Sequence, residues 1–295
     1  MRSFILAFAL LGQCFAATTV EILAGDPRFS MLVGFVQQAG LVDALNQGTF
    51  TIFAPSNDAF NKVPSATLAA LGGNITELTK VLTYHVVASS IMSSAAKNEL
   101  QVTTLNGQKA RFNVYDHNNA VTIQGCQIVA FDKVASNGVI HEVFNVMMPP
   151  TGDIVDVVSK TSNVSTLLSL VQIAGIAQAL QADGLTVFAP TNEAFARLSN
   201  DQVKKITSNH DLLVDILQYH VVAHTEYAAG LYDRESIRTI DANRDTIQLH
   251  VEGGGVRVNT DGRVVQADIG TTNGVIHLID HVLIPSRHRL ELVGR

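Results

Sequence analysis

The sequence predicts an α+β fold arranged as two tandem domains, and three observations lead to this prediction. The chain has 295 residues, of which 47% are apolar and 16% charged, which is enough to bury the cores of about two domains of ordinary size. Three sequence blocks occur twice in the same order, 135 or 136 residues apart. Within each copy, helix-like segments come first and strand-like segments follow, a segregation typical of α+β proteins rather than of parallel βαβ units.

The repeated blocks identify a tandem duplication. They are FAPSNDAF at residues 53–60 and FAPTNEAF at 188–195, YHVVA at 84–88 and 219–223, and NGVIH at 137–141 and 273–277. A period this long indicates a whole domain, because solenoid repeats are about 20–50 residues long. The Pro-Pro-Thr-Gly segment at 149–152 is typical of a boundary. We therefore expect a first domain over 17–149, a second over 150–286, and a solvated C-terminal tail over 287–295.

The first sixteen residues have the pattern of a secretory signal peptide. A positive start, Met1-Arg2, precedes an apolar run over 4–11, and small residues stand before the expected cleavage site after Ala16. No other apolar stretch approaches the ~20 residues that a membrane span needs. We expect a secreted, extracellular protein that does not span a membrane. The formal net charge of −6 without a basic stripe argues against a nucleic-acid partner.

Each copy opens with an amphipathic helix. Apolar residues recur at helical spacing at positions 29, 32, 33 and 36, and again at 164, 167, 168 and 171. Gly40 and Gly175 follow as expected C-terminal caps. A second helix in each copy has its apolar stripe at 78, 81, 82 and 85, matched by 213, 216, 217 and 220.

The strands follow a recognisable order. Residues 50–53 and 185–188 are strand-like and run into Ala-Pro, after which Ser56 and Thr191 can cap the next helix. In the first copy, Asn106-Gly107 predicts a hairpin between 102–105 and 109–114, with further strands at 121–123, 127–131 and 139–143. Asn137-Gly138 and Asn273-Gly274 are expected to form turns with positive φ.

The repeated blocks resemble the signatures of the fasciclin domain family. Residues 51–60 are similar to the N-terminal signature of that family, 186–195 repeat it, and the Tyr-His pairs and Asn-Gly-Val-Ile-His boxes complete the pattern. The resemblance covers about residues 20–285 and implies, for each domain, a β-wedge or sandwich with packed helices. It also implies a cell-adhesion or extracellular-matrix protein with no enzymatic activity and no cofactor. Its implied partners are integrins, collagen-like matrix proteins or glycans.

The Tyr-His pairs are the first candidate site. In the family, a Tyr-His pair flanked by bulky aliphatic residues is an integrin-recognition motif, and Tyr84-His85 and Tyr219-His220 have such flanks. The histidines also lie on the apolar stripe of a helix, which favours buried rings with both nitrogens satisfied. Both interpretations hold together if Tyr84 and Tyr219 point outward.

The second candidate site is Asp268-Ile269, five residues before Asn273. It resembles the Asp-Ile core of another integrin motif of the family. An exposed Asp suits that role because integrins bind acidic side chains through a cation, which prefers oxygen ligands. The counterpart in the first copy is Asp132-Lys133, which we expect to be weaker because a cation replaces the Ile. The alternative is an Asp that only stabilises a turn.

Three further features carry predictions. Asn74 and Asn163 begin Asn-x-Ser/Thr sequons and predict a glycoprotein. Cys126 is the one cysteine left after removal of the signal peptide. We expect a bulge at Gly125 that turns the thiol inward, so that it forms no disulfide between chains.

Catalytic and metal-binding patterns are weak. The histidine pairs 220/224 and 277/281 have i, i+4 spacing, but no Glu follows the first His as in a zinc protease, and no Gly-x-Ser-x-Gly motif occurs. We expect neither a metal site nor an enzyme. The main alternative to adhesion is a secreted protein that binds a small ligand or carbohydrate, in development or symbiosis. An apolar cavity of ~300 Å³ or more would favour it.

Overall fold

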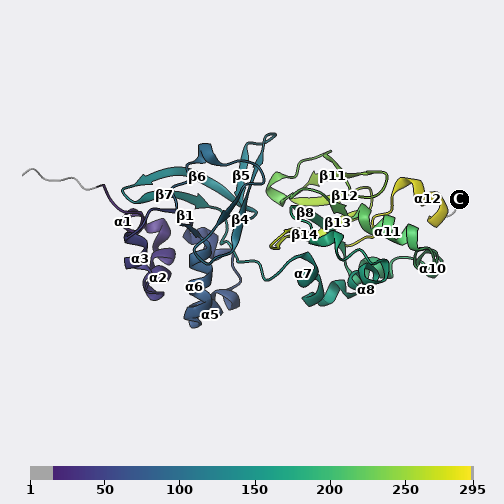
Figure 1. Cartoon of the computed structure of the whole chain (residues 1–295), viewed down its shortest axis with the longest axis horizontal. Helices are drawn as coiled ribbons and strands as arrows, with labels where there is room; N and C mark the ends of the chain where they lie inside the picture. Colours follow the sequence, from purple (N-terminus) through teal and green to yellow (C-terminus); the bar gives the residue numbers. More distant parts are fainter. Residues whose placement is uncertain (1–15, 294–295) are drawn as a thin grey trace, which may run out of the picture.

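The structure is a computed structural model that describes residues 16–293. The predicted signal peptide lies outside these residues apart from Ala16. Two domains lie side by side along the long axis of the molecule, and in the view of Figure 1 the strands of each lie above most of its helices. The segment between residues 143 and 154 connects them.

Domain 1 places most of its helices before its larger run of strands. Its helical segments are α1 (Thr19–Ala24), η1 (Pro27–Phe29), α2 (Ser30–Gln38), α3 (Val42–Asn46), α4 (Asn57–Asn61), α5 (Ser65–Gly73), α6 (Ile75–Tyr84) and η2 (Ser93–Ala95). Its strands are β1 (Phe50–Pro55), β2 (Val86–Val87), β3 (Gln101–Thr103), β4 (Lys109–Tyr115), β5 (Ala120–Ile123), β6 (Cys126–Ala135) and β7 (Gly138–Val143).

Domain 2 repeats this order and adds a helix. Its helical segments are α7 (Ile154–Lys160), η3 (Ser162–Val164), α8 (Ser165–Ala174), η4 (Ala179–Gln181), α9 (Asn192–Ala196), α10 (Asn200–Ser208), α11 (His210–Tyr219), η5 (Ala228–Gly230) and α12 (Ser286–Val293). Its strands are β8 (Leu185–Pro190), β9 (Val221–Val222), β10 (Ser236–Arg238), β11 (Thr246–Glu252), β12 (Gly255–Val258), β13 (Gly262–Gly270) and β14 (Gly274–Ile279).

Both sheets have the same topology. Over residues 16–293, each has seven strands, in the order β2-β1-β7-β6-β5-β4-β3 in domain 1 and the matching order β9-β8-β14-β13-β12-β11-β10 in domain 2. The pairs β1/β7 and β8/β14 are parallel, and the other named pairs are antiparallel. The predicted α+β class and the predicted hairpin between β3 and β4 are confirmed.

The parallel pairing of β1 with β7 and of β8 with β14 explains the glycine in each Asn-Gly block better than a turn does. Gly138 has a φ of +147°, but Gly274 does not have a positive φ in the left-handed range. A Cβ on Gly138 would lie 1.9 Å from the Phe50 carbonyl oxygen, and one on Gly274 2.0 Å from that of Leu185. The prediction of two positive-φ turns is therefore wrong for Gly274. Glycine is needed because a neighbouring strand approaches the backbone closely.

The helices begin and end largely where the sequence predicts. Gly40 and Gly175 are left-handed at the ends of α2 and α8, with φ of +67° and +68°. Thr191 caps α9 by accepting a hydrogen bond from Ala194 N, whereas Ser56 stands at the equivalent position of α4 without a side-chain cap bond. The predicted capping is thus confirmed in domain 2 only.

The segment before Cys126 differs from the prediction. Gln124 and Gly125 have φ of +48° and +75° and join β5 to β6 as a two-residue hairpin, since Ile123 pairs with Cys126. The predicted bulge at Gly125 is wrong, because the chain reverses there. The thiol still points inward and is 8% exposed. Burial raises the pKa of Cys126 to about 12.

The C-terminal segment also differs from the prediction. Residues 286–293 form α12 instead of a solvated tail. Arg287 forms ion pairs with Asp215, Asp241 and Asp245, and His288 pairs with Asp215 at 2.7 Å. Leu292 is buried in the core of domain 2. Arg287 and His288 are therefore paired with acidic residues of the same domain.

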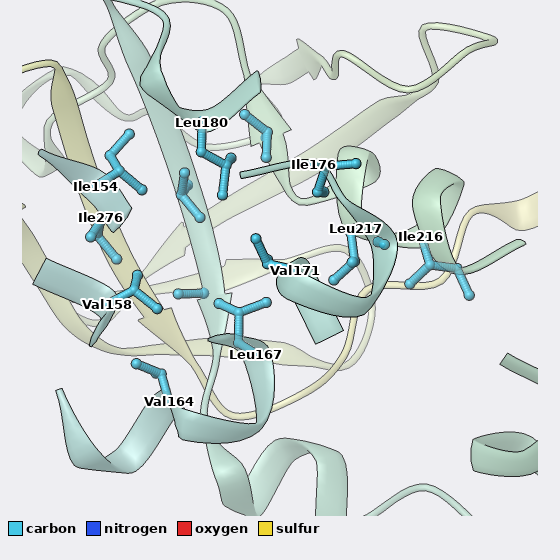
Figure 2. Packing of buried hydrophobic residues seen from close by; sticks show 14 of the residues in the cluster. Ile154, Val158, Val164, Leu167, Val171, Ile176, Leu180, Ile216, Leu217 and Ile276 are labelled. Carbon is cyan, nitrogen blue, oxygen red and sulfur yellow. The ribbon is translucent and has the colours of Figure 1, made fainter. Parts of the chain in front are cut away.

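Each domain has one core between its helices and its sheet and another within the curve of its strands. In domain 2, α7, α8 and α11 pack on β8 and β14 through Val158, Leu167, Val171, Leu217 and Ile276. Figure 2 shows these side chains in one cluster. The corresponding cluster of domain 1 includes Leu32, Val36 and Leu82. Leu32, Val36, Leu82, Leu167, Val171 and Leu217 lie on the stripes that the helical periodicity predicts.

Candidate functional site

The tyrosines of both Tyr-His pairs point into the protein. Tyr84 is 0% exposed and Tyr219 4%. Their hydroxyl groups donate to the carbonyl oxygens of Lys109 at 3.1 Å and Thr246 at 2.9 Å. Each tyrosine therefore ties the end of a helix to the far side of its sheet. The outward orientation that direct contact with a receptor would need is not present at either pair.

The histidines of these pairs are buried and fully paired. His85 Nδ1 donates to Val81 O at 2.7 Å, and its Nε2 accepts from Met147 N at 2.9 Å. His220 makes the same two bonds with Ile216 O and Leu283 N. Burial lowers the pKa of both histidines to about 4, so each ring is neutral at physiological pH. Each histidine joins the C-terminal end of a helix to the segment that follows the last strand of its domain.

The two candidate aspartates occupy equivalent positions with positive φ, +56° at Asp132 and +60° at Asp268. Asp268 Oδ1 accepts from Ala228 N at 2.8 Å, at the start of η5. Asp132 accepts from Ser93 N at 2.7 Å and from the Ser93 hydroxyl, at the start of η2. Each carboxylate therefore caps a short helical turn.

The surroundings of the two carboxyl groups differ. Burial would raise the pKa of Asp132, but the hydrogen bonds from Ser93 outweigh it and hold that pKa below its ordinary value. Desolvation raises the pKa of Asp268, which has only one such hydrogen bond. Asp268 retains an exposed surface, whereas Ile269 is half-buried and packs against the core of domain 2. Of this candidate motif, the Asp is thus the accessible member.

Both sequon asparagines are exposed. Asn74 caps α6, with its Oδ1 accepting from Thr76 N at 3.1 Å and Glu77 N at 3.2 Å. This arrangement uses the side-chain oxygen and leaves the amide nitrogen, to which a glycan is attached, directed away from the cap. Asn163 lies in η3. Both predicted glycosylation positions thus lie at the surface.

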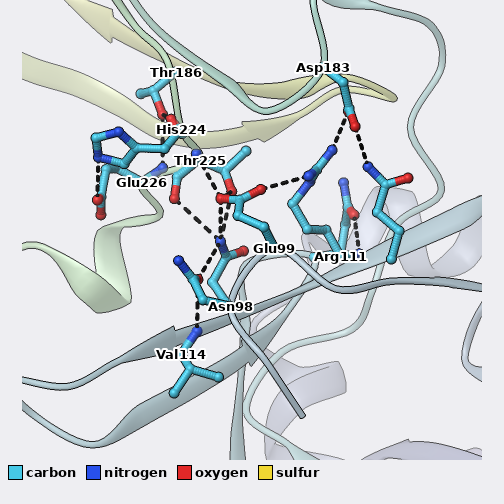
Figure 3. Close-up of polar contacts among 12 residues, drawn as sticks. Asn98, Glu99, Arg111, Val114, Asp183, Thr186, His224, Thr225 and Glu226 are labelled. Carbon is cyan, nitrogen blue, oxygen red and sulfur yellow. Dashed lines mark hydrogen bonds and ion pairs between the residues drawn. The ribbon is translucent and has the colours of Figure 1, made fainter.

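The two domains meet at a polar seam formed by β4 and the segment before it in domain 1 and by residues 183 and 224–230 in domain 2. Thr225 N donates to Glu99 Oε1 at 3.0 Å, and Asn113 Nδ2 donates to Thr225 Oγ1 at 2.7 Å. The buried Arg111 joins Glu99, at 2.6 Å, to Asp183 of domain 2. Figure 3 shows Glu99 at the centre of this network, between Arg111 and Thr225.

Beside the polar network, two aromatic rings cross the seam in opposite directions. Tyr115 of domain 1 lies against Gly230, where a Cβ would be 2.0 Å from its ring, and Tyr227 of domain 2 lies against Gly125, where a Cβ would be 2.3 Å from its ring. Tyr227 N donates to the Tyr115 hydroxyl oxygen at 3.1 Å. The two glycines thus allow each domain to receive a ring from the other.

The sequence motifs do not include the seam residues. The sequence does contain one usable signal, which is a difference in residue type between matched positions of the two copies. Tyr227 corresponds to Met92, and in the structure Tyr227 is 1% exposed whereas Met92 is 37% exposed. Glu99 similarly corresponds to Arg234. When an aromatic or charged residue in one copy is replaced by a different type in the other, that position is a candidate for a contact that only one of the two copies makes.

Two apolar pockets can be compared with the cavity of ~300 Å³ or more that would favour a protein binding a small ligand. One, of about 320 Å³, lies between α8, α9, α10 and α11 and is lined mainly by aliphatic residues such as Leu170 and Ile206. It opens to solvent. The other, of about 130 Å³, is more enclosed and lies within the helical core of domain 1.

Residues 16–293 offer neither a metal site nor a membrane-spanning helix. No cluster of three or more His, Cys, Asp or Glu side chains in this range has the arrangement of a metal site. None of the helices in it combines the length and apolar character needed to cross a bilayer.

A chain built from two copies of one α+β domain, joined by a buried seam, is a tandem-domain protein that arose by duplication. The fasciclin domain profile matches it twice, over residues 27–149 and 162–285. The chain belongs to the fasciclin domain family, and the predicted membership is confirmed.

Similar proteins include large vertebrate members of this family. The transforming growth factor-beta-induced protein ig-h3 of Oryctolagus cuniculus is 31% identical over 241 residues, which cover 81% of this chain and 35% of that protein. Periostin of Homo sapiens is 30% identical over 253 residues, covering 84% of this chain and 30% of periostin. The chain thus spans about a third of the length of these relatives.

A solved structure is also similar. The FAS1 domain pair of the insect cell adhesion molecule fasciclin I aligns with a TM-score of 0.41 and 19% sequence identity, over 88% of this chain and 98% of that one.

Proposed function

We propose that this protein is a secreted adhesion or matrix-associated protein that binds its partners through exposed surfaces and catalyses no reaction. The observation that carries the proposal is the pair of fasciclin domains, a family whose similar members include adhesion and matrix-associated proteins. The buried seam supports it, because a fixed pair presents surfaces of both domains to one partner in a constant arrangement.

The partners proposed are integrins, collagen-like matrix proteins or glycans, with Asp268 as the direct contact to an integrin. The exposed surface of Asp268 supports this role, since its carboxylate can complete the oxygen ligands of a receptor-bound cation. The buried pairs Tyr84-His85 and Tyr219-His220 are proposed as positioning residues that hold the helix ends, because their rings are enclosed.

Attachment of integrin-expressing cells to the immobilised mature protein, with and without a chelator, tests the proposal. Asp268→Asn is the informative variant, because an amide oxygen can still accept the hydrogen bond from Ala228 N while the negative charge is lost. We expect attachment to require divalent cations and to fall at least about tenfold in this variant, with thermal unfolding unchanged.

The matched control is Asp132→Asn, which makes the same change at the equivalent position before Lys133 and should reduce attachment less. Equal attachment of all three proteins would exclude Asp268 as the contact. Chelator-resistant attachment would exclude a cation-dependent integrin and direct the search to matrix proteins or glycans.

A further inference from the structure

Domain 1 contains a largely enclosed apolar cavity of about 130 Å³ between α1, α2, α3, α6 and β1. Its lining is Val20, Leu23, Leu32, Val33, Val36 and Leu41, together with residues 44, 45, 50, 52, 82, 83, 85, 86 and 105. Most of these side chains are buried or half-buried, and the exposed members, Ala44 and Leu105, mark its opening.

The two polar residues in the lining are engaged elsewhere. The Thr83 hydroxyl donates to the carbonyl oxygen of Thr79 at 2.6 Å. Both nitrogens of the neutral His85 ring are bonded to backbone groups. A molecule in the cavity would therefore meet hydrocarbon, with no free donor or acceptor from these two side chains. Such a surface selects an apolar occupant, because burying an unpaired polar group is unfavourable.

The fold itself does not require this cavity. In domain 2, residues equivalent to most of the lining surround a space of only about 20 Å³. Figure 2 shows how Leu167, Val171, Ile176, Leu180 and Leu217 fill that region. Since two copies of one architecture differ in this respect, the space in domain 1 reflects its particular side chains.

One lining position carries a larger aliphatic side chain in domain 2. Val33 of α2 corresponds to Leu168 of α8, and both are half-buried against the core of their domain. The additional methylene of Leu168 lies in the lining of the nearly closed space. Val33 is thus the natural position at which to close the cavity with a residue that the same fold already accepts.

We propose that this cavity is a binding site for a small hydrocarbon group, either a free apolar molecule about the size of benzene or the end of an acyl chain. The volume of about 130 Å³ is close to that of an engineered apolar cavity of ~150 Å³, which stays dry and binds benzene. The site lies in the helical core of domain 1, away from Asp268, and does not depend on the proposed adhesive function.

The test uses the full mature chain with benzene and with octanoate as probes. Methyl resonances of Leu32, Val33, Val36 and Leu45 are followed by carbon–proton NMR during each titration. We expect saturable shifts confined to these methyl groups. Saturation by benzene with no response to octanoate would identify a compact free ligand, whereas tighter binding of octanoate would identify an acyl chain.

Val33→Leu should weaken binding at least about tenfold, because one added methylene occupies part of the space. Val129→Leu, the same change at an exposed position of β6, should leave binding unchanged. Absence of saturable shifts in the wild-type protein, or equal binding by Val33→Leu with a normal thermal transition, would overturn the proposal.

Discussion

Four histidines among the described residues are buried, at two positions that recur in both domains. His85 and His220 join a helix end to the segment that follows the last strand of each domain. His141 and His277 accept from the backbone N–H of Asp132 and Asp268, at 3.2 Å in both cases. At the scale of the residue, the polar side chains of the family blocks satisfy buried backbone groups. That structural role accounts for their position on otherwise apolar faces.

The neutral state of His85 and His220 predicts a pH dependence of stability. Their pKa is lowered from 6.5 to about 4 in the folded protein, so the unfolded chain binds more protons between these values. The free energy of unfolding should therefore fall as the pH decreases from 6.5 to 4, by roughly 3 kcal/mol for each histidine. Chemical denaturation at several pH values measures this slope.

The control must separate the contribution of these histidines to the pH dependence of stability from the contributions of other titrating groups. Burial raises the pKa of Glu235 to about 7, which acts in the opposite direction because the folded state then holds an additional proton. We therefore compare slopes between variants. His220→Gln should flatten the slope, and the exposed His210→Gln should not. Identical slopes in all three proteins would contradict the interpretation.

Asn74 predicts a separation of glycosylation from stability. Both Asn74→Gln and Thr76→Ala abolish the sequon, but only the first removes the oxygen that caps α6. Asn74→Gln should lower the free energy of unfolding of unglycosylated protein by about 1 kcal/mol. Thr76→Ala should leave the cap in place. Mass spectrometry of protein from a secretory host and thermal unfolding of bacterial protein measure the two effects; equal unfolding of both variants would contradict the capping role.

At the scale of the element, α12 is held by charge as well as by apolar contacts. Arg287 lies among three aspartates, and Asp241 is 1% exposed. The Asp241 carboxylate also accepts from the Thr239 hydroxyl at 2.7 Å and from Asp245 N at 2.8 Å. The aspartates come from α11 and from the segment between β10 and β11, so this one arginine joins three parts of domain 2.

Removal of Arg287 should destabilise domain 2. Arg287→Ala leaves the buried Asp241 without its cation, which should lower the free energy of unfolding by about 3 kcal/mol. Arg289→Ala is the matched control two residues away, since Arg289 forms no ion pair among residues 16–293. Urea denaturation of both variants measures the difference. Equal midpoints would show that α12 contributes through its apolar contacts alone.

At the scale of the whole molecule, the seam determines how the two domains act together. Glu99 of domain 1 pairs with Thr225, 126 residues further along the chain, and Arg111 pairs with Asp183, 72 residues further along. The rings of Tyr115 and Tyr227 pack on opposing glycines. Polar groups that are paired and excluded from water fix a relative orientation, because separation leaves each of them unsatisfied or newly solvated. The pair should therefore behave as one rigid unit.

Gly230→Val tests this rigidity. The added side chain collides with the Tyr115 ring, and we expect it to open the seam, with a loss of roughly 1–3 kcal/mol. Small-angle scattering should show a larger and more variable molecule, and calorimetry should resolve two transitions in place of one. Ala95→Val makes a similar change at the equivalent, exposed position of domain 1 and should have little effect. A compact Gly230→Val protein with one transition would contradict the role of the seam.

The sequence by itself determined the duplication, the family, the order of helices and strands and most of the core. These features depend on residues close together in the chain: apolar periodicity predicts α2 and α8, and Asn-Gly at 106–107 predicts the hairpin between β3 and β4. The same local logic failed at Gly125, where an irregular alternation indicated a bulge. A two-residue hairpin also interrupts the alternation, because Gln124 and Gly125 belong to neither strand.

Only the tertiary structure decided which candidate residues are accessible and what else surrounds them. Tyr84 and Tyr219 have the sequence context of exposed motifs, yet their rings are buried and their hydroxyl groups donate to the carbonyl oxygens of Lys109 and Thr246. The seam, the ion pairs of α12 and the cavity of domain 1 likewise join residues far apart in sequence. Burial, pairing and packing at such sites depend on three-dimensional proximity, and no local pattern of residue types specifies it.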